Sequence, residues 1–424
     1  MSIMFILLIA LMALAVPVGV SVGLSSLITA LSTGAMSGSF ALRTLVSAYD
    51  SFPIIAVPLF LLAGEIMSRG GISERLFDLA RLFVGRLTGG IPMAVVACCL
   101  LFGALSGAGA ADTAAVGAIM IPAMIRMGYP KGFAAAIVAC AGGLAIVMPP
   151  SLSLILYGVG TGESVGGLFK AGIFPACIVA VCLMIYCFIF CKKNHLTNDT
   201  LALTGQKRPW VVIKNSILAV TMPVIILGGI YGGYFTPTEA AGIAVFYGLL
   251  VSVVFYKTIK IRDLYDIILT SAKQVGPILI ILGGATIFST LLIMGEIPQK
   301  VAAFILTITD NQIIFLLMVN VMLLLVGIFM ETLSSVIILA PILCPVAVTL
   351  GINPIHFGII MVVNLAIGLI TPPMAVNLFI VSSIAKTSVS DLVKSIWKPF
   401  IVMIIALLVV TYLPLVFPQI LLLD

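Results

Sequence analysis

The fold is decided by two stretches of 23 residues that each end in a pair of prolines, GYPKGFAAAIVACAGGLAIVMPP at 128–150 and GINPIHFGIIMVVNLAIGLITPP at 351–373. A proline pair removes backbone donors and clashes with the preceding helical turn, so each stretch predicts a membrane helix that is broken midway. Few residues are identical between the two stretches, but they lie 223 positions apart, the same offset that separates Pro122 from Pro345. These shared proline positions predict an internal duplication.

Each predicted broken helix follows an apolar run that is too long for one crossing. The runs at 91–127 and 312–350 are interrupted by small or polar residues, GALSGAGAADTAA at 103–115 and GIFMETLSS at 327–335. A spanning helix needs about 20 apolar residues. Each run therefore predicts a re-entrant hairpin that enters and leaves the membrane on the same side.

The composition places the chain in a lipid bilayer. Of its 424 residues, 62% are hydrophobic and 8% are charged, and the mean hydropathy is +1.32. Soluble domains carry roughly 25% charged residues, so the composition excludes a soluble enzyme, a nucleic-acid binder and a disordered protein. Residues 1–42 carry no charge and hence no basic start of a cleavable signal peptide. The apolar run 3–31 therefore predicts one retained crossing.

The lysines and arginines predict the orientation of the crossings. Of the 21, all but Arg43, Lys170 and Lys300 fall in five segments. Cytoplasmic loops are rich in Lys and Arg, so these segments are predicted to be cytoplasmic, with the N-terminus cytoplasmic and the C-terminus periplasmic. The first hairpin then opens to the cytoplasm and the second to the opposite side. The five segments are 69–90, 126–131, 192–214, 257–273 and 386–398.

These features predict an all-α polytopic membrane protein, built as an inverted repeat with two re-entrant hairpins and two broken helices. Inverted repeats with broken helices near the membrane midplane are typical of secondary transporters. The predicted boundaries are 1–195 for the first repeat (hairpin 91–127, broken helix 132–161), 196–230 for a linker with an extra crossing helix, and 231–424 for the second repeat (hairpin 312–350, broken helix 355–385).

The four breaks are the candidate binding site. Irregular backbone at membrane depth is tolerated only where it is buried or lines a wet cavity, so we expect the breaks to converge. Half-helix N-termini suit a carboxylate, and freed carbonyls suit a small cation such as sodium. Hydroxyl groups at the breaks fit a hard cation, although they can instead satisfy backbone groups left free by Pro and Gly. The candidates are Ser106, Gly107, Asp112 and Thr113; Pro149, Pro150 and Ser151; Gly327, Glu331, Thr332, Ser334 and Ser335; and Thr371, Pro372, Pro373 and Asn377.

Two acidic residues, Asp112 and Glu331, lie at the breaks. Ionisable groups inside a membrane are functional candidates, and these two could bind sodium, carry protons or cap a short helix. For Asp112 we favour capping, because it begins the helical run DTAAVGAIMIP. Glu65 and Glu239 lie outside the breaks and are interpreted as structural anchors; Glu239 follows Thr236 at an evident helix start.

The sequence contains no HExxH, phosphate-binding P-loop, GxSxG or CxxC motif. The eight cysteines show no disulfide pattern. Cys187, Cys191 and His195 have helical i, i+4, i+8 spacing, which could align three metal ligands, but nothing nearby completes a site and we interpret them as structural. The chain is predicted not to be an enzyme and to need no cofactor.

Five passages resemble the large membrane subunit (M subunit) of tripartite ATP-independent periplasmic (TRAP) transporters, and the resemblance covers essentially the whole chain. The passages are AVPLFLLAGEIMSRGGISERL at 56–76, GALSGAGAADTAAVGAIMIPAM at 103–124, IVMPPSLSLILYGVGTGESVGGLFKAGIFP at 146–175, YFTPTEAAGIAVFYGLL at 234–250 and GLITPPMAVNLFIVSSIAKTSV at 368–389.

This resemblance implies an elevator-type transporter of the bacterial inner membrane, in which hairpins and broken helices move as a transport domain against a scaffold. It also implies sodium as the coupling ion at two or more sites, a small membrane partner (Q subunit) and a periplasmic substrate-binding protein (P subunit). The first sodium site would involve Ser106 and the backbone at 149–151. The second would involve Gly327, Thr332 and the backbone at 371–374.

The resemblance also implies an organic acid substrate, such as a C4-dicarboxylate or a sialic acid. No Lys or Arg falls within the breaks, so a carboxylate would be held by helix dipoles, hydroxyls and bound sodium. The candidates for the substrate are Ser106, Gly107, Ser151, Ser334, Ser335 and Asn377. The candidates for sodium are Ser106, Asp112, Thr113, Pro149, Pro150, Gly327, Glu331, Thr332, Thr371, Pro372 and Met374.

The predicted function is sodium-coupled uptake of an organic acid anion delivered by the binding protein. The alternative is a stand-alone proton- or sodium-coupled carrier or antiporter that uses Asp112 or Glu331 and needs no binding protein. A channel is a second alternative, but channels usually repeat a filter around a pore. Paired breaks in two inverted copies fit alternating access better.

Overall fold

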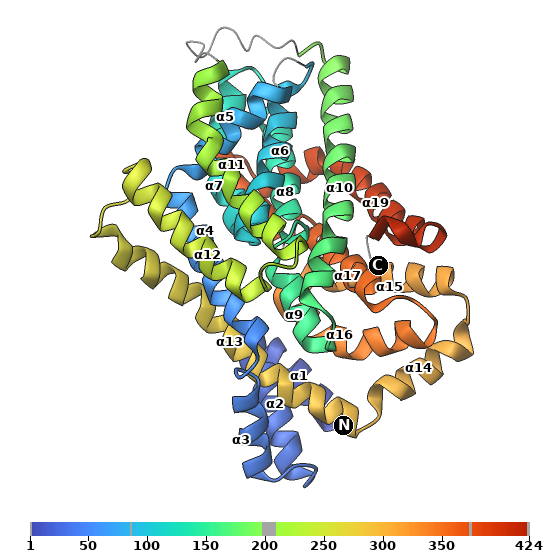
Figure 1. The fold of residues 1–424 in the computed structure, drawn as a ribbon. Helices are drawn as coiled ribbons and strands as arrows, with labels where there is room; N and C mark the ends of the chain where they lie inside the picture. Colours follow the sequence, from blue (N-terminus) through green and yellow to red (C-terminus); the bar gives the residue numbers. More distant parts are fainter. Residues whose placement is uncertain (1, 85–86, 197–208, 373–374, 422–424) are drawn as a thin grey trace.

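The computed structural model describes residues 2–84, 87–196, 209–372 and 375–421 (Figure 1). These residues form helices and no β-strand, so the predicted all-α class is confirmed. Nine helical segments among them are long and apolar enough to cross a membrane. The elements are α1 Ser2–Ala13, α2 Val18–Ser32, α3 Gly38–Ser47, η1 Phe52–Ile55, α4 Ala56–Arg69, α5 Ile72–Val84, α6 Gly90–Ser106, α7 Gly109–Arg126, α8 Lys131–Val147, α9 Leu152–Thr161, α10 Val165–Lys193, α11 Pro209–Tyr231, α12 Pro237–Leu249, η2 Leu250–Phe255, α13 Asp263–Met294, α14 Ile297–Ile308, α15 Gln312–Phe329, α16 Thr332–Thr349, α17 Pro354–Gly368, α18 Val376–Ala385, α19 Val389–Val416 and η3 Pro418–Leu421.

The helix order of the first half recurs in the second. α8 and α17 begin 223 positions apart, as do α7 and α16, and α10 and α19 begin 224 positions apart. Two helical hairpins, α6–α7 and α15–α16, precede two interrupted helices, α8–α9 and α17–α18. The first interruption falls at Pro149 and Pro150, as the sequence predicts. Division into inverted halves remains a prediction, since no membrane is present to orient them.

The apolar run 3–31 is not one crossing helix, and that prediction is wrong. α1 and α2 are separate helices that pack against each other. Ala15 between them has a left-handed φ of 59°, and Pro17 follows, which together end α1 and allow the chain to turn. Met4 of α1 and Ala30 of α2 share one buried cluster. The cytoplasmic location of the N-terminus stays a prediction.

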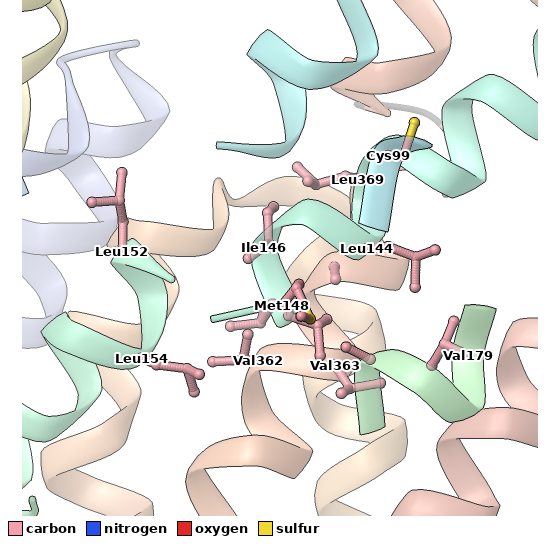
Figure 2. Close-up of a cluster of buried hydrophobic side chains, with 14 of the residues drawn as sticks. Cys99, Leu144, Ile146, Met148, Leu152, Leu154, Val179, Val362, Val363 and Leu369 are labelled. Atoms are coloured by element: carbon pink, nitrogen blue, oxygen red, sulfur yellow. The ribbon is translucent and has the colours of Figure 1, made fainter. Parts of the chain in front are cut away.

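The two interrupted helices form the centre of the molecule. All of α8 from Phe133 to Val147 is buried, and α17 is buried from His356 onward. Figure 2 shows their apolar side chains packed together, with Leu144 and Ile146 of α8 near Val362 and Val363 of α17. A Cβ atom on Gly143 would lie 3.2 Å from the carbonyl oxygen of Ala366. A small residue there lets the two helices cross closely.

Contacts between helices lie close to several of the segments predicted to be cytoplasmic. Ser216 of α11 donates to the Arg75 carbonyl of α5 at 2.9 Å, and the Arg75 guanidinium lies 3.5 Å from the ring centre of Tyr256. Phe133 of α8 stacks on Phe190 of α10 with 3.9 Å between ring centres. In Figure 1, α5 and the C-terminal end of α10 lie at the upper end, opposite to α1–α3, whereas the start of α13 lies lower, at the left. The cytoplasmic location of the five segments stays a prediction.

The outer helices pack in two corresponding pairs, α2 on α13 and α4 on α12. The α2–α13 contact depends on glycine. A Cβ atom on Gly284 would lie 2.8 Å from the backbone nitrogen of Gly23, closer than real Cβ atoms come. By contrast, Gly276 on the same helix has open space around it. The backbones of α2 and α13 thus approach each other closely at Gly284, whereas Gly276 makes no such contact.

We expect Gly284→Ala to lower the free energy of unfolding by about 1–3 kcal/mol, because the added methyl group forces α2 and α13 apart. Gly276→Ala is the matched control and should leave stability unchanged or slightly increased, since alanine favours the helix by about 1 kcal/mol. Thermal unfolding of the two purified variants distinguishes them. Equal melting temperatures would show that the α2–α13 contact is not close-packed.

Candidate functional site

The tip of the first hairpin is a left-handed glycine. α6 ends at Ser106, and Gly107 has a φ of 61° while donating its N–H to the Gly103 carbonyl at 3.0 Å. A Cβ atom on Gly107 would lie 2.7 Å from the Pro150 carbonyl oxygen and 3.3 Å from the Cα of Ser151. The backbone of the hairpin tip therefore rests directly on the backbone of the first broken helix.

Ser106 and Asp112 form the polar core of this tip. The Ser106 hydroxyl donates to Oδ1 of Asp112 and accepts the Ala108 N–H at 3.2 Å. Asp112 is fully buried, and its Oδ2 has no hydrogen-bond partner. The capping role favoured for Asp112 is wrong, because α7 starts earlier, at Gly109, and its N-cap is Ala108 with no side-chain bond. The free carboxylate oxygen is instead available to a ligand.

Two other candidates of the first half satisfy backbone groups. Ser151 accepts the Leu154 N–H at 3.3 Å at the start of α9 and donates to the carbonyl of Ile146 across the break. Thr113 donates to the Gly109 carbonyl at 2.8 Å. Such bonds compensate for helix ends buried inside an apolar bundle. Pro149 and Pro150 have no polar side-chain atoms, so they could contribute to a site only through the backbone at the break.

The second hairpin carries its hydroxyl groups at the start of α16. Ser335 donates to the Glu331 carbonyl at 2.9 Å, and Ser334 donates to Oε2 of Glu331 at 3.3 Å. Glu331 is exposed and is the N-cap residue of α16. Thr332 is buried, and its Oγ1 has no partner. As at the first tip, one buried oxygen is left free.

This hairpin meets its own broken helix through two glycines. A Cβ atom on Gly327 would lie 3.0 Å from the Cα of Gly368. In the first half, Gly103 of α6 lies still more tightly against Ala145 of α8, because a Cβ atom on Gly103 would overlap the Cα of Ala145. Ala145 lies 223 positions before Gly368. The two halves therefore use the same seam between hairpin and broken helix.

The second break is bonded to both halves. Thr371 donates to the Ile367 carbonyl at 2.9 Å, and the Asn377 N–H spans the break to the Leu369 carbonyl at 3.1 Å. The Asn377 amide also donates to the Ala139 carbonyl of α8 at 3.0 Å, while its Oδ1 has no partner. Pro372 is partly buried. Pro373 and Met374 lie outside the described residues, so the proposed role of Met374 is untested.

Each hairpin tip thus lies on the break of its own half, and the halves are joined by Asn377 and by the crossing of α8 and α17. In addition, α9 packs on α16 and α7 packs on α18, so each half reaches into the other. The candidates with unpartnered buried oxygens are Asp112, Thr332 and Asn377.

A small pocket of about 30 Å³ opens beside the first tip, between it and the helices α4 and α13. It is lined by Ser106 and Asp112 together with Glu65, Ser68 and Gln274, among others. The sequence analysis assigned no site role to Ser68 or Gln274. The signal that could have found them is a polar side chain that breaks an apolar run near a predicted membrane helix.

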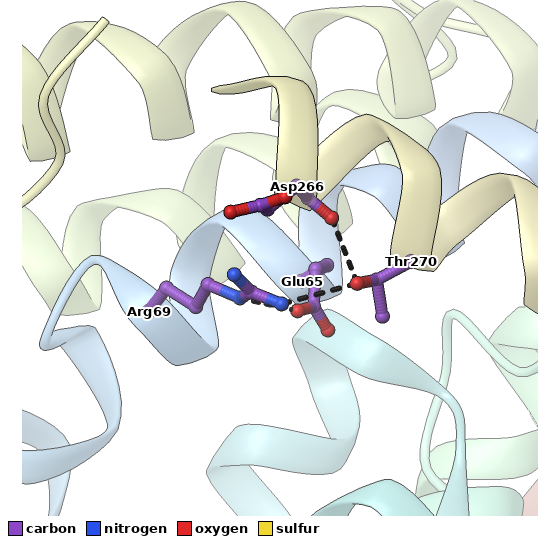
Figure 3. Close-up of polar contacts among 4 residues, drawn as sticks. All are labelled: Glu65, Arg69, Asp266 and Thr270. Atoms are coloured by element: carbon purple, nitrogen blue, oxygen red, sulfur yellow. Dashed lines mark hydrogen bonds and ion pairs between the residues drawn. The ribbon is translucent and has the colours of Figure 1, made fainter. Parts of the chain in front are cut away.

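An ion pair secures the wall of this pocket (Figure 3). Arg69 lies 2.6 Å from Oε1 of Glu65, one turn earlier on α4, and donates to the Thr270 hydroxyl of α13 at 3.1 Å. Thr270 in turn donates to the Asp266 carbonyl at 2.7 Å. Glu65 therefore acts as the structural anchor predicted from the sequence, by holding Arg69 where it bridges α4 and α13.

The chemistry of these breaks suits a hard cation together with an anion. Carboxylate, hydroxyl and amide oxygens are the unpartnered groups, and such oxygens favour hard cations. The helices α7, α9, α16 and α18 all begin at the breaks, so their N-terminal dipoles present partial positive charge there. Among the described residues no three His, Cys, Asp or Glu side chains gather as a transition-metal site would require.

Paired hairpins and interrupted helices with polar breaks in an apolar bundle define the class of secondary membrane transporters. The sequence profile of the DctM component of tripartite ATP-independent periplasmic transporters matches residues 5–416. The chain therefore belongs to this family, as the resemblance in the sequence indicated.

Individual relatives agree with this membership. The isethionate TRAP transporter permease protein DctMQ of Oleidesulfovibrio alaskensis is 39% identical over 94% of this chain, which spans 63% of that relative's length. The C4-dicarboxylate TRAP transporter large permease protein DctM of Pseudomonas aeruginosa is 39% identical over 86% of this chain and 85% of its own. The crystal structure of the YdaH transporter of Alcanivorax borkumensis shares the fold, with a TM-score of 0.69 at 17% identity, covering 90% of this chain and 89% of its own.

The contact between the first tip and the first break can be tested with Gly107→Ala. Gly162→Ala is the matched control, since Gly162 also ends a helix, has a φ of 79° and has nothing within 4 Å of an added Cβ. Both variants incur the left-handed penalty of about 1–2 kcal/mol. We expect Gly107→Ala to lose about 1–3 kcal/mol more, because its methyl group meets the Pro150 carbonyl. Equal losses in thermal unfolding would contradict the contact.

Proposed function

We propose that the protein takes up an organic acid anion together with sodium. The observation that carries this proposal is the buried, unpartnered oxygen at each hairpin tip, Asp112 Oδ2 in the first half and Thr332 Oγ1 in the second. An unsatisfied polar atom inside an apolar bundle is costly, and a sodium ion would satisfy both. Ser106 and the backbone at 149–151 complete the first proposed site, and Gly327 and the backbone at 371–372 contribute to the second.

The proposed substrate is anionic because the breaks offer helix N-termini and hydroxyls to it. Ser151, Ser334, Ser335 and Asn377 lie at the starts of α9, α16 and α18, where dipoles favour a carboxylate. The relatives named for isethionate and for C4-dicarboxylate are both named for organic anions. A C4-dicarboxylate or a sialic acid accordingly remains the proposed class of substrate.

The proposed mechanism is an elevator. The hairpins and interrupted helices are joined by tight seams at Gly103, Gly143 and Gly327, which supports their moving as one domain. The helices α2, α13, α4 and α12 pack on one another in that order, α2 on α13, α13 on α4 and α4 on α12, as a scaffold would. Interfaces between such bodies accommodate sliding when each body is rigid in itself.

The proposed partners are a periplasmic binding protein, which delivers the substrate, and a small membrane subunit. They follow from the family of tripartite transporters to which the chain belongs. The proposed location is the bacterial inner membrane. An alternative, favoured by the unpartnered oxygen of Asp112, is a proton-coupled carrier that works without a binding protein.

Uptake into proteoliposomes tests the proposal. This chain is reconstituted with the small subunit and a candidate binding protein, and a sodium gradient is compared with choline at fixed pH. We expect uptake to need both sodium and the binding protein. Uptake that continues in choline but follows a pH gradient, and is lost in Asp112→Asn, would replace sodium coupling with proton coupling.

The ion sites are tested by Ser106→Ala and Thr332→Val. Each removes one hydroxyl at a hairpin tip, and we expect each to raise the sodium concentration for half-maximal uptake about tenfold, the effect of losing one hydrogen bond to a charge. Thr286→Val is the control, because that hydroxyl donates only to the Leu282 carbonyl within α13, at 3.0 Å. A sodium dependence that shifts equally in all three variants would contradict the assignment.

A further inference from the structure

A chain of buried hydrogen bonds joins three helices of the second half. The Asn364 amide of α17 donates to Oδ1 of Asn320 of α15 at 2.7 Å, and the Asn320 amide donates to the Thr411 hydroxyl of α19 at 3.1 Å. Thr411 then donates to the Leu407 carbonyl at 2.8 Å. All three side chains are at most 2% exposed. We refer to Asn320, Asn364 and Thr411 as the amide network.

The amide network lies on the seam that leads to the second hairpin tip. Asn364 and Gly368 are one turn apart on α17, and Asn320 and Gly327 are seven residues apart on α15, so each pair shares a helix face. Further from the tip, Phe315 stacks on Phe357 with 6.4 Å between ring centres. The contacts of α15 with α17 thus advance in one direction along both helices, with the amide network midway.

Further bonds of α17 tie it along the same stripe. His356, Ile360, Asn364 and Gly368 recur at intervals of four. The ring nitrogen Nε2 of His356 lies 3.0 Å from the Val410 carbonyl of α19, next to Thr411, and Asn364 also donates to the Ile360 carbonyl at 2.8 Å. Rotation of α17 about its axis would break the bonds of His356 to Val410 and of Asn364 to Asn320 together, whereas the bond of Asn364 to Ile360 lies within α17.

The corresponding positions of the first half carry no side-chain amide. The position 223 residues before Asn364 is Ala141, and that 224 residues before Thr411 is Cys187. The stretch of α6 that faces α8, Val-Val-Ala-Cys-Cys at 95–99, contains no amide. The hairpin and its close glycine contact therefore form without an amide network.

The fold does not require these buried amides, because the first half forms without an amide network. Their presence in the second half therefore indicates a function specific to that half. Amide groups in an apolar interior are unfavourable unless they are bonded, and bonds between membrane helices fix the register of helices that apolar packing alone leaves free to slide. Oδ1 of Asn364 has no hydrogen-bond partner. The amide network is therefore not fully satisfied in its hydrogen bonds.

Resting on the proposed sodium coupling, we infer that Asn320, Asn364 and Thr411 are positioning residues for the second ion site. They fix the register of α15 against α17 and α19. Through the Gly327–Gly368 contact, that register sets where the Thr332 hydroxyl lies relative to the second break. None of the three touches the ion. Their loss moves the ligands of the second site apart and weakens sodium binding there.

The test uses Thr411→Val, which removes the hydroxyl while keeping the shape, and Thr411→Ser, which keeps the hydroxyl. Cys187→Val is the matched control in the first half. The readout is the melting temperature of the purified chain against sodium, with choline holding ionic strength constant, because an ion that binds the native state stabilises it with its own concentration dependence. Asn364→Leu is a second, more severe variant.

We expect the sodium concentration at half-maximal stabilisation to rise about threefold to tenfold in Thr411→Val, a range set by the measured strength of polar contacts between membrane helices. Thr411→Ser and Cys187→Val should remain within about twofold of the unmodified chain. Asn364→Leu, if it folds, should shift at least as far as Thr411→Val. If it does not fold, Thr411→Val alone decides.

The experiment distinguishes a failure of the proposed sodium coupling from a failure of the inference about the amide network. If the unmodified chain is not stabilised by sodium over choline, sodium coupling itself is wrong and the inference falls with it. If the unmodified chain responds to sodium, and Thr411→Val melts at a lower temperature with an unchanged sodium midpoint, the amide network only stabilises the fold. That second result would overturn the inference and leave the proposed function intact.

Discussion

The structure depends on one constraint, that backbone groups released at a helix break inside an apolar bundle must find partners within the protein. Each break meets it locally. Ser151 bonds the chain on both sides of the first proline pair, and the Asn377 N–H reaches back across the second break to Leu369. At the hairpin tips, the Gly107 N–H bonds Gly103 and the Met330 N–H bonds Val326. With the backbone satisfied in this way, side-chain oxygens are left over, and among the described residues each hairpin tip holds one that is buried and unpartnered, Asp112 Oδ2 and Thr332 Oγ1.

The same constraint explains why glycine recurs where the hairpins meet the broken helices and where the two broken helices cross. Breaks can be buried only if neighbouring backbone approaches closely, and a Cβ atom at Gly103, Gly143 or Gly327 would meet another helix at 3.2 Å or less. The close approach then excludes lipid and water from the break and holds hairpin and helix as one body. Packing and site geometry are therefore not separable in this fold, because one set of small residues produces both.

The features of this fold that depend on local sequence patterns could be predicted, and those that depend on packing between distant segments could not. Proline pairs and interrupted apolar runs are local, so the interruption at Pro149 and Pro150 and the two hairpin turns lie where the sequence predicts them. The separation of α1 from α2 was missed, because an uncharged run looks continuous and the turn at Ala15 shows only in its φ of 59°. The role of Asp112 was misassigned since α7 begins three residues before it, at Gly109. The pocket lining from α4 and α13 depends on packing between distant segments, which one sequence does not contain.

The two halves repeat a backbone without repeating its side-chain chemistry. The first tip holds the buried carboxylate of Asp112, whereas the second holds the Thr332 hydroxyl, with Glu331 exposed and bonded to Ser334. A charge attracts a cation over several ångströms, so a site built on a carboxylate tolerates small displacements. A neutral hydroxyl contributes only when its oxygen lies at bonding distance, so a site built on one depends on rigid support. For the proposed sodium sites, this difference would account for the amide network behind the second tip and for alanine and cysteine at the corresponding positions behind the first.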